Sequence, residues 1–119
     1  MKPITRIRKD VEIKQGDTLA FPFTFEHADG TPVDITNWTI GIAVKIDRQE
    51  PDTEAVILKT NTTHTDPVNG TTSIYLNEDD TDVPIADYQF AIRIRTGTND
   101  VREIMIGNFK VDVSPRGEI

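Results

Sequence analysis

The densest group of side chains that could bind a metal ion is the acidic run Asn77-Glu-Asp-Asp-Thr-Asp82. Calcium takes roughly six to eight oxygen ligands, and loop carboxylates can supply several of them. Asp79, Asp80 and Asp82 are the candidate ligands, but the spacing lacks the alternating ligands, central Gly and later Glu of an EF-hand. We therefore predict a solvated acidic turn without a metal or cofactor, with a calcium site as the alternative.

The remaining residue types that commonly perform catalysis are sparse. His27 and His64 lie in polar segments, with no Ser, Cys or second His at a catalytic spacing. The chain has no Cys, which excludes a disulfide, a thiolate zinc site and a Cys nucleophile. It also contains no phosphate-binding loop, HExxH motif or nucleophile elbow. We predict exposed loop histidines and a protein that is not an enzyme.

Basic residues form one possible binding stripe on an acidic chain. Arg93 and Arg95 alternate with apolar neighbours and so share one strand face, where Lys45 of another strand could join them. A charged sheet face is usually only solvated, and a partner-binding face is the alternative. The net charge of -7 disfavours binding to nucleic acid or to a membrane surface. The N-terminal segment lacks the apolar core of a signal peptide, so we expect a protein that is made in the cytoplasm and either used there or assembled there into a particle.

The elements that must position these side chains are strands, because apolar residues recur at every second position. This alternation predicts a single domain, residues 1–119, with an immunoglobulin-like antiparallel β-sandwich fold of about seven strands and no disulfide. We expect residues 1–9 and 114–119 to be loose ends, and residues 79–85 to form at most one helical turn. Shorter strands are predicted at 11–13, 55–60, 72–76 and 104–113. The three clearest apolar sets are Leu19, Phe21, Phe23 and Phe25; Trp38, Ile40, Ile42, Val44 and Ile46; and Tyr88, Phe90, Ile92 and Ile94.

The stretch ADYQF predicts a tyrosine corner, as in immunoglobulin-like sandwiches. Tyr88 should face inward and bond its hydroxyl to nearby backbone, and Phe90 stands where such domains carry a Cys. We expect Trp38 and either Phe23 or Phe25 to pack against Phe90. The alternative is a half-buried strand start that merely contains a Tyr.

Two residues predict irregularities within the strands. Pro22 has no amide hydrogen, so its strand should leave that position unpaired at an edge or a bulge. Ile104 and Ile106 share one face of a strand, and Phe109, Val111 and Val113 share one face, but the two sets are an odd number of residues apart. This change in the alternation between Ile106 and Phe109 predicts a β-bulge at Gly107.

The order of turn and strand motifs resembles the immunoglobulin-like N-terminal domain of the upper baseplate proteins of tailed bacteriophages, and related small phage tail modules. That family has a Gly-Asp-Thr before one strand, an Asp-Leu-Thr-like motif before the next, and a Gly-x-Tyr-like motif opening a late strand. Ile35 here replaces the Leu, and Ala86 replaces the Gly. The motifs that carry the resemblance are QGDT (15–18), ADGTPVDITNWTI (28–40), ADYQFAIRI (86–94) and IGNFKVDV (106–113).

The resemblance implies a non-enzymatic structural component of a phage tail or baseplate that acts through protein–protein contacts in a symmetric assembly. Its partners would be other tail or baseplate proteins or further copies of itself, and it would reside in the virion after assembly in the bacterial host cytoplasm. Baseplate proteins continue beyond this domain, so this chain would be either an excised fragment or, as we expect, a complete, free-standing module. The alternative is a carbohydrate- or receptor-binding β-sandwich, for which Tyr75 is the one expected exposed strand aromatic while Trp38 is expected to be buried.

Overall fold

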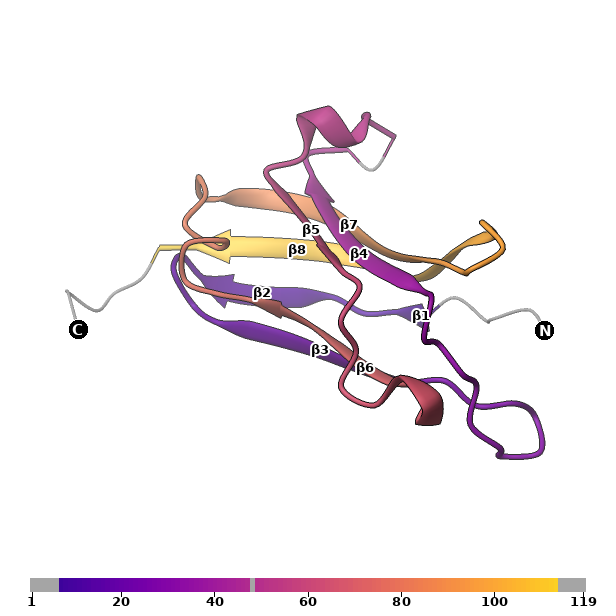
Figure 1. The fold of residues 1–119 in the computed structure, drawn as a ribbon. Helices are drawn as coiled ribbons and strands as arrows, with labels where there is room; N and C mark the ends of the chain where they lie inside the picture. The colour runs from indigo at the N-terminus through magenta and orange to yellow at the C-terminus, as the bar shows by residue number, and fades with distance from the viewer. Residues whose placement is uncertain (1–6, 48, 114–119) are drawn as a thin grey trace.

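The protein is an all-β sandwich, seen in a computed structural model that describes residues 7–47 and 49–113. Figure 1 shows its two layers, with β3 and β6 lying across the sheet that contains β4, β7 and β8. Two short 3-10 helices, η1 (Asp52–Glu54) and η2 (Pro67–Asn69), are the helical segments of the described chain, and neither could cross a membrane. The strands are β1 (Ile7–Arg8), β2 (Val11–Lys14), β3 (Leu19–Thr24), β4 (Thr39–Lys45), β5 (Ile57–Asn61), β6 (Thr71–Leu76), β7 (Ala86–Arg95) and β8 (Val101–Asp112).

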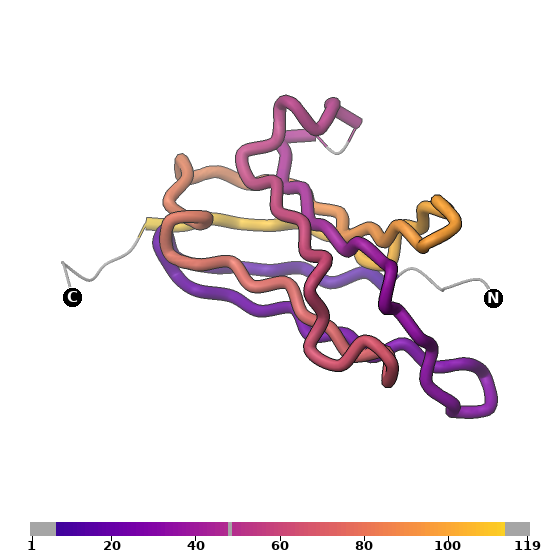
Figure 2. The backbone as a smooth tube through the Cα atoms, in the orientation of Figure 1, coloured from indigo at the N-terminus to yellow at the C-terminus, as the bar shows by residue number. Residues whose placement is uncertain are grey.

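The larger sheet is mixed, and this differs from the wholly antiparallel sandwich that was expected. Its order is β1-β8-β7-β4-β5, with β2 also paired to β8, and both β1 and β2 run parallel to β8. Ile7 stands opposite Met105 and Val11 opposite Phe109, so the two short strands keep one register and form a single interrupted edge strand. Figure 2 traces this segment, in indigo, beside the yellow β8. Residues 7–9 are therefore held in place, which corrects their expected position in a loose end; residues 1–6 and 114–119 lie outside the described residues.

Gly107 serves the close approach of two backbones, and the bulge predicted there is wrong. The Lys9 amide donates to the Ile106 carbonyl at 2.9 Å. A Cβ at Gly107 would lie 1.7 Å from the Lys9 carbonyl oxygen, so only glycine leaves room for that chain. One residue further, the Asp10 carboxylate accepts from the Asn108 amide at 3.1 Å and replaces a backbone partner where the edge strand is interrupted.

The phase change in β8 occurs earlier in the strand. Ile92 pairs with Met105, whereas Arg93 pairs with Glu103, and this leaves Ile104 as the extra residue of a bulge. Both Ile104 and Met105 are buried in the core. The alternation of inward and outward side chains in β8 therefore changes at Ile104, before the position at which the sequence pattern placed the change.

The core lies between the two sheets, and an aromatic cluster fills its centre. Phe90 is fully buried and packs against Phe21 and Phe109, with ring centroids 5.8 and 5.9 Å away. Two aromatic rings, one from each sheet, thus occupy the space that a disulfide would bridge, as packing rather than as a covalent link.

The predicted neighbours of Phe90 form a separate aromatic group. Trp38 is buried as expected, but its ring packs on Phe25 at 5.3 Å, and Phe25 in turn stacks on Phe23 at 6.2 Å. The prediction that these rings surround Phe90 is wrong, because strand alternation gives the face of each ring but not its height along the sandwich.

Two local predictions are confirmed. Tyr88 is 2% exposed and its hydroxyl donates to the Pro84 carbonyl at 2.6 Å, which is the tyrosine corner. Pro22 lies opposite Ser73 in β3, which pairs only with β6 among the described strands and so has a free edge.

Candidate interaction surface

The outer face of the larger sheet has a floor of small residues. Ala43 of β4 stands opposite Ala91 of β7, with Gly41 in the next row, and Leu58 of β5 and Ile106 of β8 flank the two alanines. Small side chains at the centre of a sheet face allow another chain to come close to the backbone. Sequence alternation already assigned Gly41, Ala43 and Ala91 to the outer face, although their small size was not recognised as a signal.

A groove of about 150 Å³ lies over this floor. Arg93 and Arg95 project along it from β7, while Leu58 and Val101 line it with exposed apolar surface. Asp52 of η1 completes the lining from above β4. The groove therefore combines apolar contact area with charge, which is the usual composition of a protein-binding surface.

Lys45 does not belong to an exposed basic stripe, and this part of the prediction is corrected. Its side chain is on the predicted face but is only 4% exposed. The ammonium lies 2.7 Å from the Asp52 carboxylate and donates to the Glu50 carbonyl at 2.7 Å. The segment that contains η1 folds over the sheet and covers Lys45, and strand alternation contains no information about that loop.

Asp52 joins the loop to the sheet electrostatically. The hydrogen bond from Lys45 is the main cause that holds the pKa of Asp52 below its usual value, with a further contribution from the charge of Arg93. The Arg93 guanidinium lies 3.5 Å from the same carboxylate. Arg95 makes no ion pair within the part of the chain that the structure describes, so its charge remains available to a partner.

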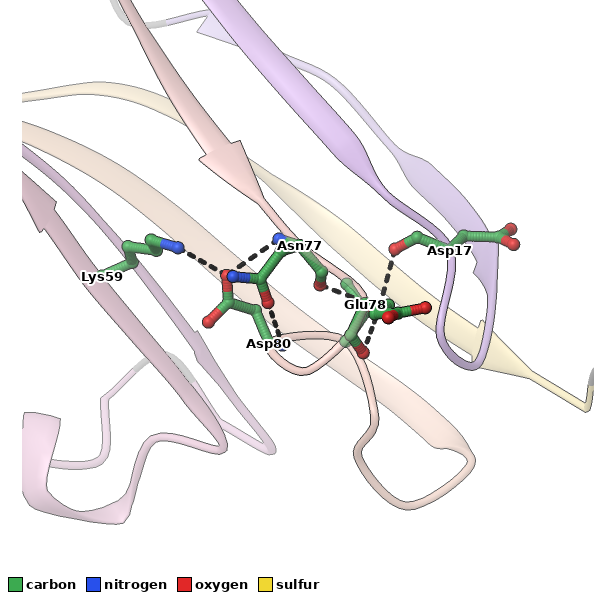
Figure 3. Close-up of polar contacts among 6 residues, drawn as sticks. Asp17, Lys59, Asn77, Glu78 and Asp80 are labelled. Carbon is green, nitrogen blue, oxygen red and sulfur yellow. Dashed lines mark hydrogen bonds and ion pairs between the residues drawn. The ribbon is translucent and has the colours of Figure 1, made fainter. Parts of the chain in front are cut away.

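The acidic run forms a tightly bonded turn, which Figure 3 shows in close-up. The Asp80 carboxylate accepts from the Asn77 amide at 2.9 Å, and the Asp80 amide donates to the Asn77 side-chain oxygen at 2.9 Å. Lys59 binds the same carboxylate at 2.6 Å. The Thr81 hydroxyl donates to the Asp17 carbonyl at 2.6 Å, which ties the turn to the start of β3. The Thr81 amide bonds the Asn77 carbonyl at 3.3 Å, a single helical-type bond.

These contacts give the three candidate metal ligands different surroundings. Burial raises the pKa of Asp80, but the hydrogen bonds from Lys59 and Asn77 outweigh it and hold the pKa below its usual value. Asp79 and Asp82 are exposed. Within residues 7–47 and 49–113, no three His, Asp or Glu side chains come together as a metal site would require. The calcium alternative thus has no geometric support.

The two histidines differ. His27 is exposed, as predicted, whereas His64 is half-buried and the prediction of an exposed loop histidine is wrong. Its Nε2 donates to the Trp38 carbonyl at 2.8 Å, because a carbonyl oxygen only accepts, and its Nδ1 lies 2.8 Å from the Thr72 hydroxyl. His64 therefore fastens its loop to Trp38, which directly precedes β4, and to Thr72 of β6, and that structural role accounts for both nitrogens.

A second hollow, of about 220 Å³, lies between β5 and β6. Tyr75 is 51% exposed there, as predicted, beside Lys59 and Asn61. The Asn61 side-chain amide donates to the Ser73 carbonyl at 2.9 Å and links the two sheets across this opening.

No protein-family model matches the chain, and no curated protein matches its sequence.

Proposed function

We propose that this chain is a non-enzymatic structural component of a phage tail or baseplate, present in the virion after assembly in the bacterial cytoplasm. The observation that supports it best is the groove on the outer face of the larger sheet, with its small-residue floor and the exposed arginines Arg93 and Arg95. A surface of this kind suits contact with protein better than with a small substrate, because it is shallow and contains no set of catalytic groups.

The residues that carry the resemblance have structural roles that agree with this proposal. Gly16 adopts φ +86°, and the Asp17 carboxylate accepts from the Lys14 amide at 2.9 Å in the turn before β3. Tyr88, near the start of β7, makes the hydrogen bond of the tyrosine corner to the Pro84 carbonyl. The motifs thus specify turns of the sandwich, and the link to phage tail proteins rests on their order along the chain.

The larger sheet also offers strand edges to a partner. β5 pairs only with β4 among the described strands, and the interrupted strand β1–β2 forms the opposite edge. Free edges accept an added strand through main-chain hydrogen bonds, a common mode of contact in assemblies. These edges suit the partners that we propose, which are other tail or baseplate proteins or copies of this chain.

The test is the composition of purified particles. Tailed particles from the phage or prophage that encodes the chain should contain it in fixed proportion to the known tail proteins by quantitative mass spectrometry. Gold-labelled antibodies against the chain should mark the tail and not the head, and antibodies against a host cytoplasmic protein are the control. Absence of the chain from washed, gradient-purified particles overturns the proposal.

The second candidate function is carbohydrate binding, and the hollow at Tyr75 favours it. An exposed aromatic ring beside Lys59 and Asn61 offers a stacking surface next to hydrogen-bonding groups. A glycan array should then give hits that disappear with Tyr75→Ala and persist with Arg95→Ala, which changes the other face. Hits that are insensitive to Tyr75→Ala, or no hits, argue against a sugar site.

A further inference from the structure

The groove on the outer face carries more positive than negative charge. Arg93 and Arg95 line it, and Asp52 is the opposing carboxylate in the lining. Asp52 is already bound by the buried Lys45 at 2.7 Å. Glu103 stands opposite Arg93 on β8. Since Lys45 neutralises Asp52, the two arginines of the groove face Glu103 as the one further carboxylate, on a chain whose net charge is -7.

The turn between β6 and β7 has the opposite character. The side chains of Glu78, Asp79 and Asp82 are exposed and make no ion pair among the described residues. The backbone beneath them is fixed by the bonds of Asp80 to Asn77 and Lys59 (Figure 3). These three carboxylates are thus presented on a preformed frame, so that binding would require little ordering of the chain.

The turn and the groove lie on opposite sides of the larger sheet. Lys59, which binds the Asp80 carboxylate at 2.6 Å, stands opposite Ile42, whose side chain points into the core. Arg93 and Arg95 line the groove on the outer face instead. The sheet therefore separates a molecule's own turn from its groove, whereas the turn of a second molecule can approach the outer face directly.

We propose that the groove formed by Arg93, Arg95, Leu58 and Val101 binds the acidic turn Glu78-Asp79-Asp80-Thr81-Asp82 of a second copy of this chain. Elsewhere two copies with net charge -7 repel each other, so this pairing of opposite charges selects both the partner and the orientation. The contact joins different surfaces of the two copies and is therefore head-to-tail. Such contacts repeat into a closed ring or an open filament.

This inference rests on the proposed role in a symmetric assembly and specifies one of its contacts. Because the charges are exposed, association should weaken with salt. Reversing the groove charges places like charges together, and the dissociation constant should rise at least about tenfold.

The experiment measures mass in solution by light scattering after size exclusion, over a wide range of concentration at low salt. The groove variant is R93E/R95E and the turn variant is D79K/D82K. R8E/K110E, which changes the net charge as much as the groove variant at exposed sites outside the groove, is the matched control. Thermal unfolding verifies that each variant folds.

We expect the wild type and the control to associate, and each of the two variants alone to remain at 13.4 kDa. A mixture of the two variants should associate again with the two variants in alternation, because each intact turn meets an intact groove and each reversed turn meets a reversed groove. A chain that carries all four reversals should associate again.

Two results overturn the inference. Association of both variants as strong as that of the wild type means that another surface is used, and a wild type that stays at 13.4 kDa at every concentration means that copies do not pair. Neither result decides the proposed function, which the composition of purified particles tests separately.

Discussion

The two faces of the larger sheet are built by alternate residues of the same strands, yet they have little in common. Ile42 and Ile92 point into the core and are at most 1% exposed, while their chain neighbours Ala43 and Ala91 lie on the outer face beneath a shallow groove. The inner face contains large apolar side chains that determine the fold. The outer face contains small residues and charges whose pattern the fold does not require. Recognition can therefore change on this sheet without a change of architecture.

The largest expected effect is on the inner face. Phe90→Ala should lower the free energy of unfolding by about 3–5 kcal/mol, because it removes the ring between Phe21 and Phe109 and leaves a cavity. Chemical denaturation measures the loss. A loss below about 1 kcal/mol would mean that the centre of the sandwich collapses around the missing ring.

The next prediction concerns an outer-face residue that is buried like an inner one. Lys45→Met should cost about 1.5–3 kcal/mol, since it removes hydrogen bonds to Asp52 and to the Glu50 carbonyl. Denaturation at neutral pH measures this.

The stabilisation provided by the ion pair of Lys45 and Asp52 should depend on pH. The pKa of Asp52 is lowered in the folded state from its ordinary 3.8, so its stabilisation is present above that value and is lost as the pH falls through the folded pKa. The difference between wild type and Lys45→Met should therefore shrink in acid. A difference that is constant down to pH 2 would contradict the role of Asp52, and Asp52→Asn is the control.

Gly107→Ala should cost about 1–3 kcal/mol, because the added methyl group must displace the Lys9 backbone. Hydrogen exchange at the Lys9 amide, which bonds the Ile106 carbonyl, should accelerate more than exchange in β4. Equal acceleration everywhere would show that the edge strand does not open separately.

Tyr88→Phe should cost about 0.5–1.5 kcal/mol through loss of the hydrogen bond to the Pro84 carbonyl. Burial raises the pKa of Tyr88 above its ordinary 10.0, so the wild type should lose stability as the pH rises through this range. Tyr88→Phe should lose less stability than the wild type over this pH range. A free energy of unfolding for Tyr88→Phe equal to that of the wild type would argue against the hydrogen bond of the tyrosine corner.

The smallest effect is expected on the outer face. Arg95→Ala should change the free energy of unfolding by less than about 0.5 kcal/mol, because the side chain is exposed and unpaired among the described residues. Denaturation beside Phe90→Ala gives the comparison directly. A loss above about 1 kcal/mol would remove the distinction between the two faces.

The predictions from the sequence were correct for features that depend on a single strand. Alternation predicted the burial of Trp38 and Phe90 and the exposure of Tyr75, and one local motif predicted the bond of Tyr88. The predictions failed where a feature depends on a second segment of the chain. Lys45, for example, is buried because the segment that contains η1 covers it.

Other contacts between segments far apart in the chain were likewise not predicted from the sequence. His64 is held by the Trp38 carbonyl and by Thr72 of β6, and Gly107 is needed because the Lys9 backbone approaches it closely. The candidate surface was predicted in part, since the face of Arg93 and Arg95 follows from alternation, but its groove depends on which strands become neighbours.

The parallel pairing of β1 and β2 with β8 has a consequence for biosynthesis. Asp10 and its partner Asn108 are 98 residues apart in the chain. At the ribosome the earlier segment emerges about 5–20 s before its partner, given about 5–20 residues added per second. Because β1 and β2 pair with β8 alone among the described strands, this edge of the sheet can form only after β8, the last of these strands, has been synthesised.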